Sequence, residues 1–215
     1  MISIKKNLYQ LIFFALFFIF INNTVQANNI KNSAVVFMYH KFGISKYPST
    51  NVTIKQLNSH ISELSQEKYN VKSLDFIVDT IINDGQLPNN TVGISVDDAD
   101  RSFLTTAWPK FKEKNFPVTL FVNTSTIVKN NKNYLNWDEI RILKGEGVII
   151  GAHSHSHSHM PDLSIEEIKN EIEISNQIFL KELGLIPSLF AYPYGEADEK
   201  IIELLKKYKF KVSFG

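Results

Sequence analysis

The chain has 215 residues, of which 44% are hydrophobic, and its formal net charge is +1. This length and composition indicate one globular domain with its own core and argue against several domains. The small net charge, without a basic stripe interleaved with aromatic residues, argues against a nucleic-acid partner.

The N-terminus has the composition of a targeting segment. Lys5 and Lys6 precede an apolar run over residues 11–21, and Val25-Gln26-Ala27 approximates a small-x-small cleavage site. We predict a cleaved signal peptide over residues 1–27 and an exported product in the periplasm, in the cell envelope or outside the cell. The alternative is an uncleaved leader that contacts a membrane, but the apolar run is shorter than the roughly 20 residues that span a bilayer. The chain has no cysteine, so no disulfide stabilises it.

After the leader, short β-rich runs alternate with helical patterns. In chain order we expect a strand at 34–39, a helix from 54, a strand at 69–74, a helix at 75–84 closed by Gly85, a strand at 91–97, a helix at 102–114, a strand at 117–122, a helix at 137–144, a strand at 147–151, the longest helix from 165, a strand at 188–192, a helix at 197–208 and a strand at 211–214.

Two of these helices have specific start signals. Thr53 with Gln56, and Ser164 with Glu167, match the capping-box pattern, in which the two side chains bond the unpaired backbone donors of the first turn. The second pair opens the longest helix, which is expected to end before Gly184. The buried stripe of that helix is predicted at Ile165, Ile168, Ile172 and Leu180.

Seven strands that alternate with helices indicate a parallel α/β fold, because parallel neighbours need a crossover that is usually helical. A barrel and an open doubly wound sheet both fit this pattern. Polar side chains at the ends of several strands favour the barrel, which gathers all strand ends around one mouth. These side chains are Tyr39, His40, Asp97, Asp98, His153, Tyr192 and Tyr194. We therefore predict a distorted (β/α) barrel of about seven parallel strands.

Asp97 and Asp98 end an apolar strand where Ala99 and Asp100 interrupt it. Two adjacent carboxylates repel each other, and a bound dication relieves the repulsion by ligating one while the other stays free as a base. The alternative is an acidic loop or a helix cap, in which Asp98 or Asp100 caps the helix near Ser102.

Four histidines fall within residues 153–159. Positions four apart lie about 13 Å apart on a strand and about 6 Å apart on a helix or tight turn, so only a turn lets His153 and His157 share an ion. Two imidazoles and a carboxylate suit a zinc ion that keeps one position open for water. The alternative is a solvated His/Ser tract, which fits His155 and His159 more readily.

Three blocks in order resemble those of the polysaccharide deacetylases with a NodB homology domain, carbohydrate esterase family 4. Ser95-Val-Asp-Asp-Ala99 resembles the Thr-Phe-Asp-Asp-Gly block, and His153-Ser-His-Ser-His157 resembles the His-Ser/Thr-x-x-His block. Phe190-Ala-Tyr-Pro-Tyr-Gly195 resembles the Arg-x-Pro-Tyr-type block. The segment Val36-Phe-Met-Tyr-His-Lys-Phe-Gly43 is similar to the branch that acts on poly-N-acetylglucosamine. The resemblance runs from Ala34 to the end of the chain.

The resemblance implies an enzyme that hydrolyses N-acetyl groups from a glycan containing N-acetylglucosamine. Asp98, His153 and His157 would hold a divalent metal, with Zn²⁺ favoured. Asp97 would be the catalytic base, and the backbone N–H of Tyr194 would support the oxyanion. The N-acetylated glycan would be the substrate partner, and the deacetylase domain would extend over residues 28–215.

The chain departs from the family pattern at three places. Ala191 stands where many relatives have an arginine that orients the base, and Ala99 replaces a glycine. The later blocks, an Asp/Trp segment and a Leu-x-His block with the general acid, are absent before Gly215, which implies a domain that is incomplete at its C-terminal end. Two alternatives therefore stay open: a non-catalytic glycan- or metal-binding barrel, and a hydrolase of another acyl or amide substrate. The sequence assigns no oligomeric state and no role to His40, His155 or His159.

Overall fold

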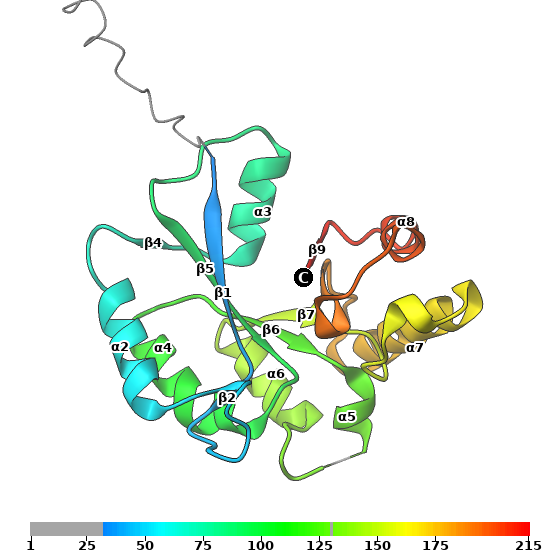
Figure 1. Ribbon diagram of the computed structural model, residues 1–215, viewed down its shortest axis with the longest axis horizontal. Helices are drawn as coiled ribbons and strands as arrows, with labels where there is room; N and C mark the ends of the chain where they lie inside the picture. The colour runs from blue at the N-terminus through cyan, green and yellow to red at the C-terminus, as the bar shows by residue number, and fades with distance from the viewer. Residues whose placement is uncertain (1–31, 130) are drawn as a thin grey trace, which may run out of the picture. The chain divides into compact units, whose positions relative to one another are not determined.

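A curled sheet of seven strands forms the centre of the computed structural model, which describes residues 32–129 and 131–215 (Figure 1). All of its strand pairs are parallel, in the order β1-β5-β6-β7-β8-β9, and β4 pairs with the start of β5. The strands are β1 (Ala34–Tyr39), β4 (Asn70–Val71), β5 (Thr91–Asp97), β6 (Thr119–Val122), β7 (Ile149–Ala152), β8 (Leu189–Ala191) and β9 (Val212–Phe214). A second sheet pairs β2 (Lys41–Phe42) with β3 (Asn51–Val52).

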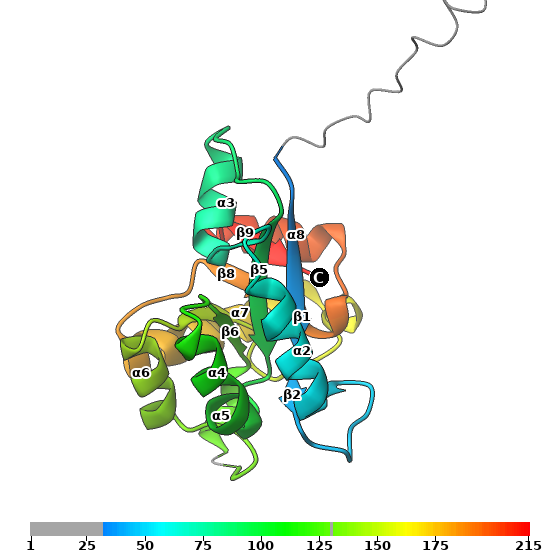
Figure 2. The same ribbon diagram turned by 90° about the vertical axis from the view of Figure 1, so that its left-hand side faces the viewer.

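The described residues also form seven α-helices. Of these, α2 and α4 lie side by side (Figure 2). They are α2 (Ile54–Leu64), α3 (Leu74–Ile82), α4 (Trp108–Glu113), α5 (Thr124–Val128), α6 (Trp137–Gly145), α7 (Ile165–Leu183) and α8 (Glu199–Lys207). Three short turns are the π-helical η1 (Phe103–Ala107) and the 3-10 segments η2 (Met160–Asp162) and η3 (Pro193–Gly195). None of the helices in this part of the chain combines the length and the apolar composition needed to cross a membrane.

The two faces of the sheet bury different residues because side chains alternate along each strand. On β5, Val92, Ile94 and Val96 belong to the larger core between the sheet and the outer helices. Gly93 faces the other way, and a Cβ atom there would lie 2.5 Å from a methyl group of Leu74 in α3. The face of the sheet on which Gly93 lies is therefore covered by α3 at the start of β5. At the carboxyl ends of the strands a cavity opens in the structure.

The strand register brings the predicted polar residues to one level. Tyr39 pairs with Val96, so His40 follows β1 at the level of Asp97 on β5. Val122 pairs with Ala152, which puts Asn123 beside His153. The carboxyl ends of parallel strands meet at one edge, and the candidate site lies there.

The predicted fold class is confirmed, since the strands are parallel, alternate with helices and curl as in part of a barrel. Both capping boxes are present, at Thr53 and at Ser164. Gly184 ends α7 in the left-handed conformation, with φ 69°. The signal peptide predicted over residues 1–27 lies outside the described residues.

Several predicted details are wrong. The strand expected at 69–74 is only Asn70–Val71, because Ser73 caps α3. That helix ends at Ile82, and the left-handed residue after it is Asp84 (φ 53°) rather than Gly85. The helix expected at 102–114 is split into η1 and α4, and α5, β2 and β3 were not predicted.

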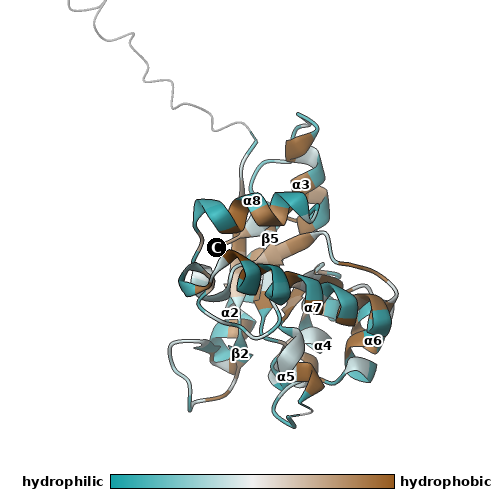
Figure 3. Ribbon diagram, turned by 90° about the vertical axis from the view of Figure 1, so that its right-hand side faces the viewer, coloured by the Kyte–Doolittle hydropathy of each residue, from teal (hydrophilic) through white to brown (hydrophobic). Residues whose placement is uncertain are grey.

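The predicted buried stripe of α7 also needs correction. Ile168 and Ile172 are buried, but Ile165 and Leu180 are 54% and 55% exposed, and Phe179 is buried instead. A 3.6-residue repeat places Phe179 seven residues after Ile172, on the same face. Hydrophobic and hydrophilic residues alternate along α7 and α8 accordingly (Figure 3).

Candidate metal centre

Asp97 and Asp98 line one cavity, although consecutive residues of a strand face opposite sides. The backbone turns into the left-handed region at Asp98 (φ 71°) and Ala99 (φ 56°), immediately after β5. This turn directs both carboxylates to the same cavity, whose volume is about 540 Å³. Non-glycine residues in this region cost about 1–3 kcal/mol each and cluster at functional sites.

The capping alternative applies to Asp100 and not to Asp98. Asp100 is buried, and its Oδ1 accepts hydrogen bonds from the backbone N–H of Ser102 at 2.9 Å and from the Ser102 hydroxyl at 2.5 Å. Asp98 is left to face the histidines.

His153 and His157 lie across a turn that follows β7, as the sequence predicts. Ser154 and His157 have positive φ angles of 60° and 61°. The Ser154 hydroxyl oxygen accepts a hydrogen bond from the backbone N–H of His157 at 3.0 Å. The two Nε2 atoms are 3.1 Å apart.

Asp98 completes a group of three. Its Oδ1 lies 3.7 Å from Nε2 of His153 and 3.4 Å from Nε2 of His157. A tetrahedral zinc ion with bonds of 2.0–2.1 Å separates its ligand atoms by about 3.3 Å. The observed separations fit such an ion, and among the described residues this is the one group of three or more His, Asp or Glu side chains close enough to hold a metal.

Neighbouring polar groups orient the ligands. His153 is 2% exposed, and its Nδ1 lies 2.8 Å from the carbonyl oxygen of Ala191. Burial is the main cause that lowers the pKa of His153 to about 4, so the ring is neutral at pH 7. The Asn123 side chain donates to Oδ1 of Asp98 at 3.2 Å. Asn123 could have been found in the sequence, since it directly follows a predicted strand.

Asp97 is buried without a hydrogen-bond partner for Oδ1. Asp97 is 4% exposed. Burial, together with the charge of Asp98, raises the pKa of Asp97 to about 8. Ala191 lines the same cavity and offers no cation. A positive charge bound at Asp98 would relieve this unfavourable arrangement, so the surroundings of Asp97 fit a nearby dication.

Tyr194 lies at the mouth of the cavity. Its backbone is left-handed, with φ 59°, and its side chain is 57% exposed. The ring of His159 stacks on the Tyr194 ring at 3.9 Å, and Nδ1 of His159 is 2.7 Å from a carboxylate oxygen of Glu196. The ring of His157 meets the Tyr194 ring edge-on at 4.6 Å.

His155 and His40 also lie outside the group of three. His155 contacts the Thr124 hydroxyl through Nδ1 at 2.8 Å. His40 lines the cavity that contains Asp97 and Asp98. Burial lowers the pKa of His40, and the charge of Asp98 partly opposes this effect.

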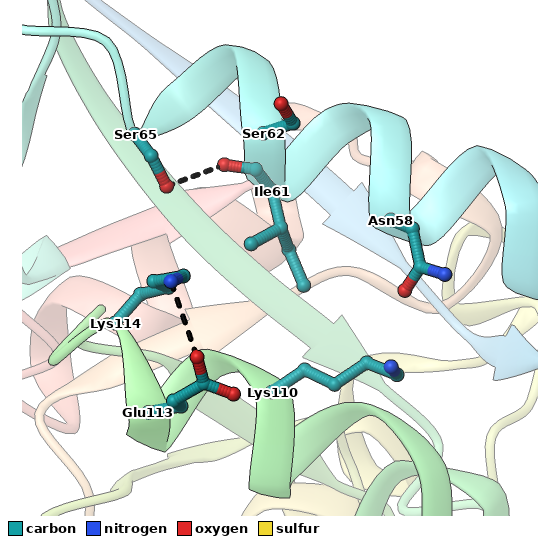
Figure 4. A pocket seen from close by; sticks show the side chains of 7 residues that line it. All are labelled: Asn58, Ile61, Ser62, Ser65, Lys110, Glu113 and Lys114. Atoms are coloured by element: carbon teal, nitrogen blue, oxygen red, sulfur yellow. Dashed lines mark hydrogen bonds and ion pairs between the residues drawn. The ribbon is translucent and has the colours of Figure 1, made fainter.

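A second cavity, of about 330 Å³, lies between α2 and α4 (Figure 4). Its lining includes no histidine, and its carboxylate, Glu113, pairs with Lys114 at 3.1 Å. This cavity therefore offers no set of metal ligands. The lining residues are Asn58, Ile61, Ser62, Ser65, Lys110, Glu113 and Lys114.

Residues 84–213 match the polysaccharide deacetylase family. The chain is 26% identical over 164 residues to chitin deacetylase 1 of Cryptococcus neoformans var. grubii. The matched residues make up 75% of this chain and 33% of that protein. It is 24% identical over 210 residues to the poly-beta-1,6-N-acetyl-D-glucosamine N-deacetylase of Staphylococcus epidermidis, over 86% of this chain and 72% of that protein. A peptidoglycan-N-acetylglucosamine deacetylase of Bacillus cereus is 25% identical over 122 residues, which are 56% of this chain and 42% of that protein. The matched segments thus span less than half the length of two of these relatives.

Two solved structures resemble the fold. The Streptococcus pyogenes deacetylase PplD, in complex with acetate, superposes with a TM-score of 0.77 and 18% identity over 85% of this chain and 82% of that chain. IcaB from Ammonifex degensii superposes with a TM-score of 0.75 and 20% identity over 83% of this chain and 82% of that chain. At such identities the likeness concerns the arrangement of strands and helices, and it agrees with the predicted fold class.

Proposed function

The chain belongs to the polysaccharide deacetylase family, which it matches over residues 84–213, and we propose that it removes N-acetyl groups from a glycan by metal-assisted hydrolysis. The proposed glycan contains N-acetylglucosamine, the sugar named in the B. cereus and S. epidermidis relatives. The deacetylase domain would extend over residues 28–215.

One observation supports this function above all others. Three ligand atoms from Asp98, His153 and His157 lie within 4.8 Å of one another, beside the unpartnered carboxylate of Asp97. We propose that the three side chains hold a divalent cation, with Zn²⁺ favoured by its preference for two imidazoles and one carboxylate. When bound, such an ion lowers the pKa of a water molecule from 15.7 to about 7 and polarises a carbonyl group.

Asp97 is the proposed base. Its carboxylate accepts the proton of the attacking water, and its burial keeps bulk solvent from competing for that proton. The charge of Asp98 contributes to the raised pKa of Asp97, and a cation on Asp98 would cancel that contribution. Asp97 would then be ionised nearer to neutral pH, as a base requires.

Two further groups at the cavity have proposed roles. The backbone N–H of Tyr194 would donate to the oxyanion that forms when the amide carbonyl is attacked. His40, in its protonated form, would give a proton to the leaving amine, because it lines the cavity and is not among the three ligands. The charge of Asp98 favours this protonated form against the effect of burial, and the proton that Asp97 has taken from water would return to solvent.

The test is acetate release from N-acetylglucosamine oligomers. We expect release by the purified chain, loss of release after a chelator removes the metal, and recovery when Zn²⁺ is added. Asp97→Asn should slow release by about 10²- to 10⁴-fold in the presence of Zn²⁺. A chain that binds the oligomers without any acetate release would instead be a binding module, and release from other acyl amides alone would indicate a different hydrolase.

Export is a separate proposal that depends on the predicted leader. N-terminal sequencing of the product from the exporting cell should begin at Asn28, the residue after the proposed cleavage site. A product that still begins at Met1 would contradict cleavage.

A further inference from the structure

The turn that bears both histidine ligands is bonded by a carboxylate of α7 that is not a ligand itself. Oε2 of Glu171 accepts hydrogen bonds from the backbone N–H of His155 at 3.0 Å and of Ser156 at 2.7 Å. Oε1 accepts a hydrogen bond from the Ser156 hydroxyl at 2.7 Å. Bonds to an ionised carboxylate are stronger than bonds between neutral groups, so three of them restrain this turn well.

The turn needs such restraint because its backbone is unfavourable. Ser154 and His157 both lie in the left-handed region, and together they determine how far His153 stands from His157. Conformations of this kind persist only where surrounding contacts over-determine them. His155 and Ser156, whose N–H groups donate hydrogen bonds to Glu171, lie between the two left-handed residues.

The start of α5 holds the opposite side of the same turn. The backbone N–H of Ser125 donates to the carbonyl oxygen of His155 at 2.9 Å, and the Thr124 hydroxyl contacts the His155 ring at 2.8 Å. His155, midway between the two ligands, is therefore fixed from both directions. This position gives His155 a structural contact in place of a metal bond.

Other acidic residues of α7 bond elsewhere. Glu166 pairs with Lys169 at 3.2 Å, and Glu173 accepts a hydrogen bond from the Tyr208 hydroxyl. Glu171 thus differs from both in bonding the ligand-bearing turn.

We propose that Glu171 is a positioning residue that sets the separation of His153 and His157 for a divalent cation. This inference rests on the metal site of the proposed function, but not on the glycan or on the reaction. Contacts that orient metal ligands in this way are typically worth 10- to 100-fold in metal affinity.

Zinc affinity of the metal-free chain, measured by competition with a chromophoric chelator, tests the proposal without any substrate. Glu171→Ala should weaken zinc binding by about 10- to 100-fold. Glu171→Gln should fall between Glu171→Ala and the unchanged chain, because its one carbonyl oxygen can still accept from the backbone. Glu166→Ala, on the same helix, should bind zinc as the unchanged chain does. The visible absorption spectrum of bound Co²⁺ should change in Glu171→Ala and not in Glu166→Ala.

Wild-type zinc affinity in a folded Glu171→Ala chain would overturn the proposal. If Glu171→Ala does not fold, the zinc affinity of Glu171→Gln is compared with that of the control Glu166→Gln. Equal zinc affinities of these two variants would overturn the proposal. His157→Ala separates this failure from failure of the site itself. A His157→Ala chain that binds zinc normally would refute the metal site, whereas loss of zinc there with full affinity in the Glu171 variants would refute only the positioning role.

Discussion

Nδ1 of His153 lies 2.8 Å from the carbonyl oxygen of Ala191, and this contact determines which nitrogen can bind a metal. A carbonyl oxygen only accepts hydrogen bonds, so Nδ1 must bear the proton. The neutral ring then leaves the lone pair of Nε2 free, and Nε2 is the atom that faces Asp98 and His157. The backbone of β8 thus holds one ligand in its metal-binding tautomer.

The ligand assignment predicts which substitutions remove the metal. Asp98→Ala and His157→Ala should each reduce bound zinc to a small fraction of one equivalent, because two remaining ligands bind weakly. His159→Ala should retain the metal, since its ring contacts Tyr194 and Glu196 instead. Elemental analysis after dialysis measures the zinc content. Retention of zinc by both ligand variants would contradict the assignment.

Asp97→Asn should separate metal binding from turnover. The amide keeps the shape of the side chain but cannot accept the water proton, so we expect kcat to fall by about 10²- to 10⁴-fold with zinc content unchanged. Steady-state acetate release and elemental analysis on the same preparation make the comparison. If Asp97→Asn lost zinc as Asp98→Ala does, the division of roles between the two carboxylates would be wrong.

The pKa of Asp97 predicts a pH dependence of stability in the metal-free chain. Burial and the charge of Asp98 raise that pKa from 3.8 to about 8, so between these values the folded chain retains a proton that the unfolded chain has released. The free energy of unfolding should therefore fall as pH rises through this window, by at most about 1.4 kcal/mol per pH unit.

The buried His153 acts in the opposite sense. Its pKa is lowered from 6.5 to about 4, so its contribution to stability is present above pH 6.5 and is lost as pH falls toward 4. Between pH 6.5 and 8, therefore, the titration of Asp97 still changes the free energy of unfolding, whereas that of His153 no longer does. Urea unfolding with a chelator present should show declining stability over this interval in the unchanged chain and a flatter profile in Asp97→Asn. Equal slopes in the two chains would disprove the effect.

Much of the fold could be predicted because the local signals agree with the final packing. The strand at Thr91–Asp97 and the capping boxes at Thr53 and Ser164 depend on neighbours in sequence, and all three were predicted correctly. The short strand Asn70–Val71 could not be bounded from its sequence. It pairs only with the start of β5, and this distant contact sets its length.

The candidate site was predictable in its composition but not in its supports. Asp98, His153 and His157 lie together as predicted. The carboxylate of Glu171 in α7 accepts hydrogen bonds from the histidine-bearing turn, and no sequence pattern predicts that contact. Asp97 was expected to lie beside Asp98, but its burial without a partner depends on residues brought from several strands.

His40 should affect the reaction more than binding of metal or glycan. If it protonates the leaving amine, His40→Ala should lower kcat by about 10²- to 10⁴-fold while zinc content and KM change little. An activated ester of acetate, whose leaving group needs no proton, should be hydrolysed at a nearly normal rate by the same variant. Comparable losses on the amide and the ester would assign His40 a structural role instead.

Gly151 is predicted to be required for packing immediately before the histidine turn. A Cβ atom at Gly151 would lie 2.3 and 2.4 Å from two ring atoms of Phe121, which is too close for any side chain. Phe121 is 1% exposed and pairs with Gly151 across β6 and β7, so its ring has little room to move. Gly151→Ala should therefore lower the free energy of unfolding by about 1–3 kcal/mol.

Gly145→Ala is the matched control for this substitution, because a Cβ at Gly145 in α6 meets nothing within 4 Å. Alanine also favours the helix, so Gly145→Ala should leave stability unchanged or raise it by up to about 1 kcal/mol. Combining Gly151→Ala with Phe121→Leu should recover part of the loss, since a smaller side chain makes room for the added methyl group. Urea unfolding of the three variants measures these differences. A Gly151→Ala chain as stable as Gly145→Ala would show that β6 and β7 can separate, and that the backbone before His153 is less constrained than its packing indicates.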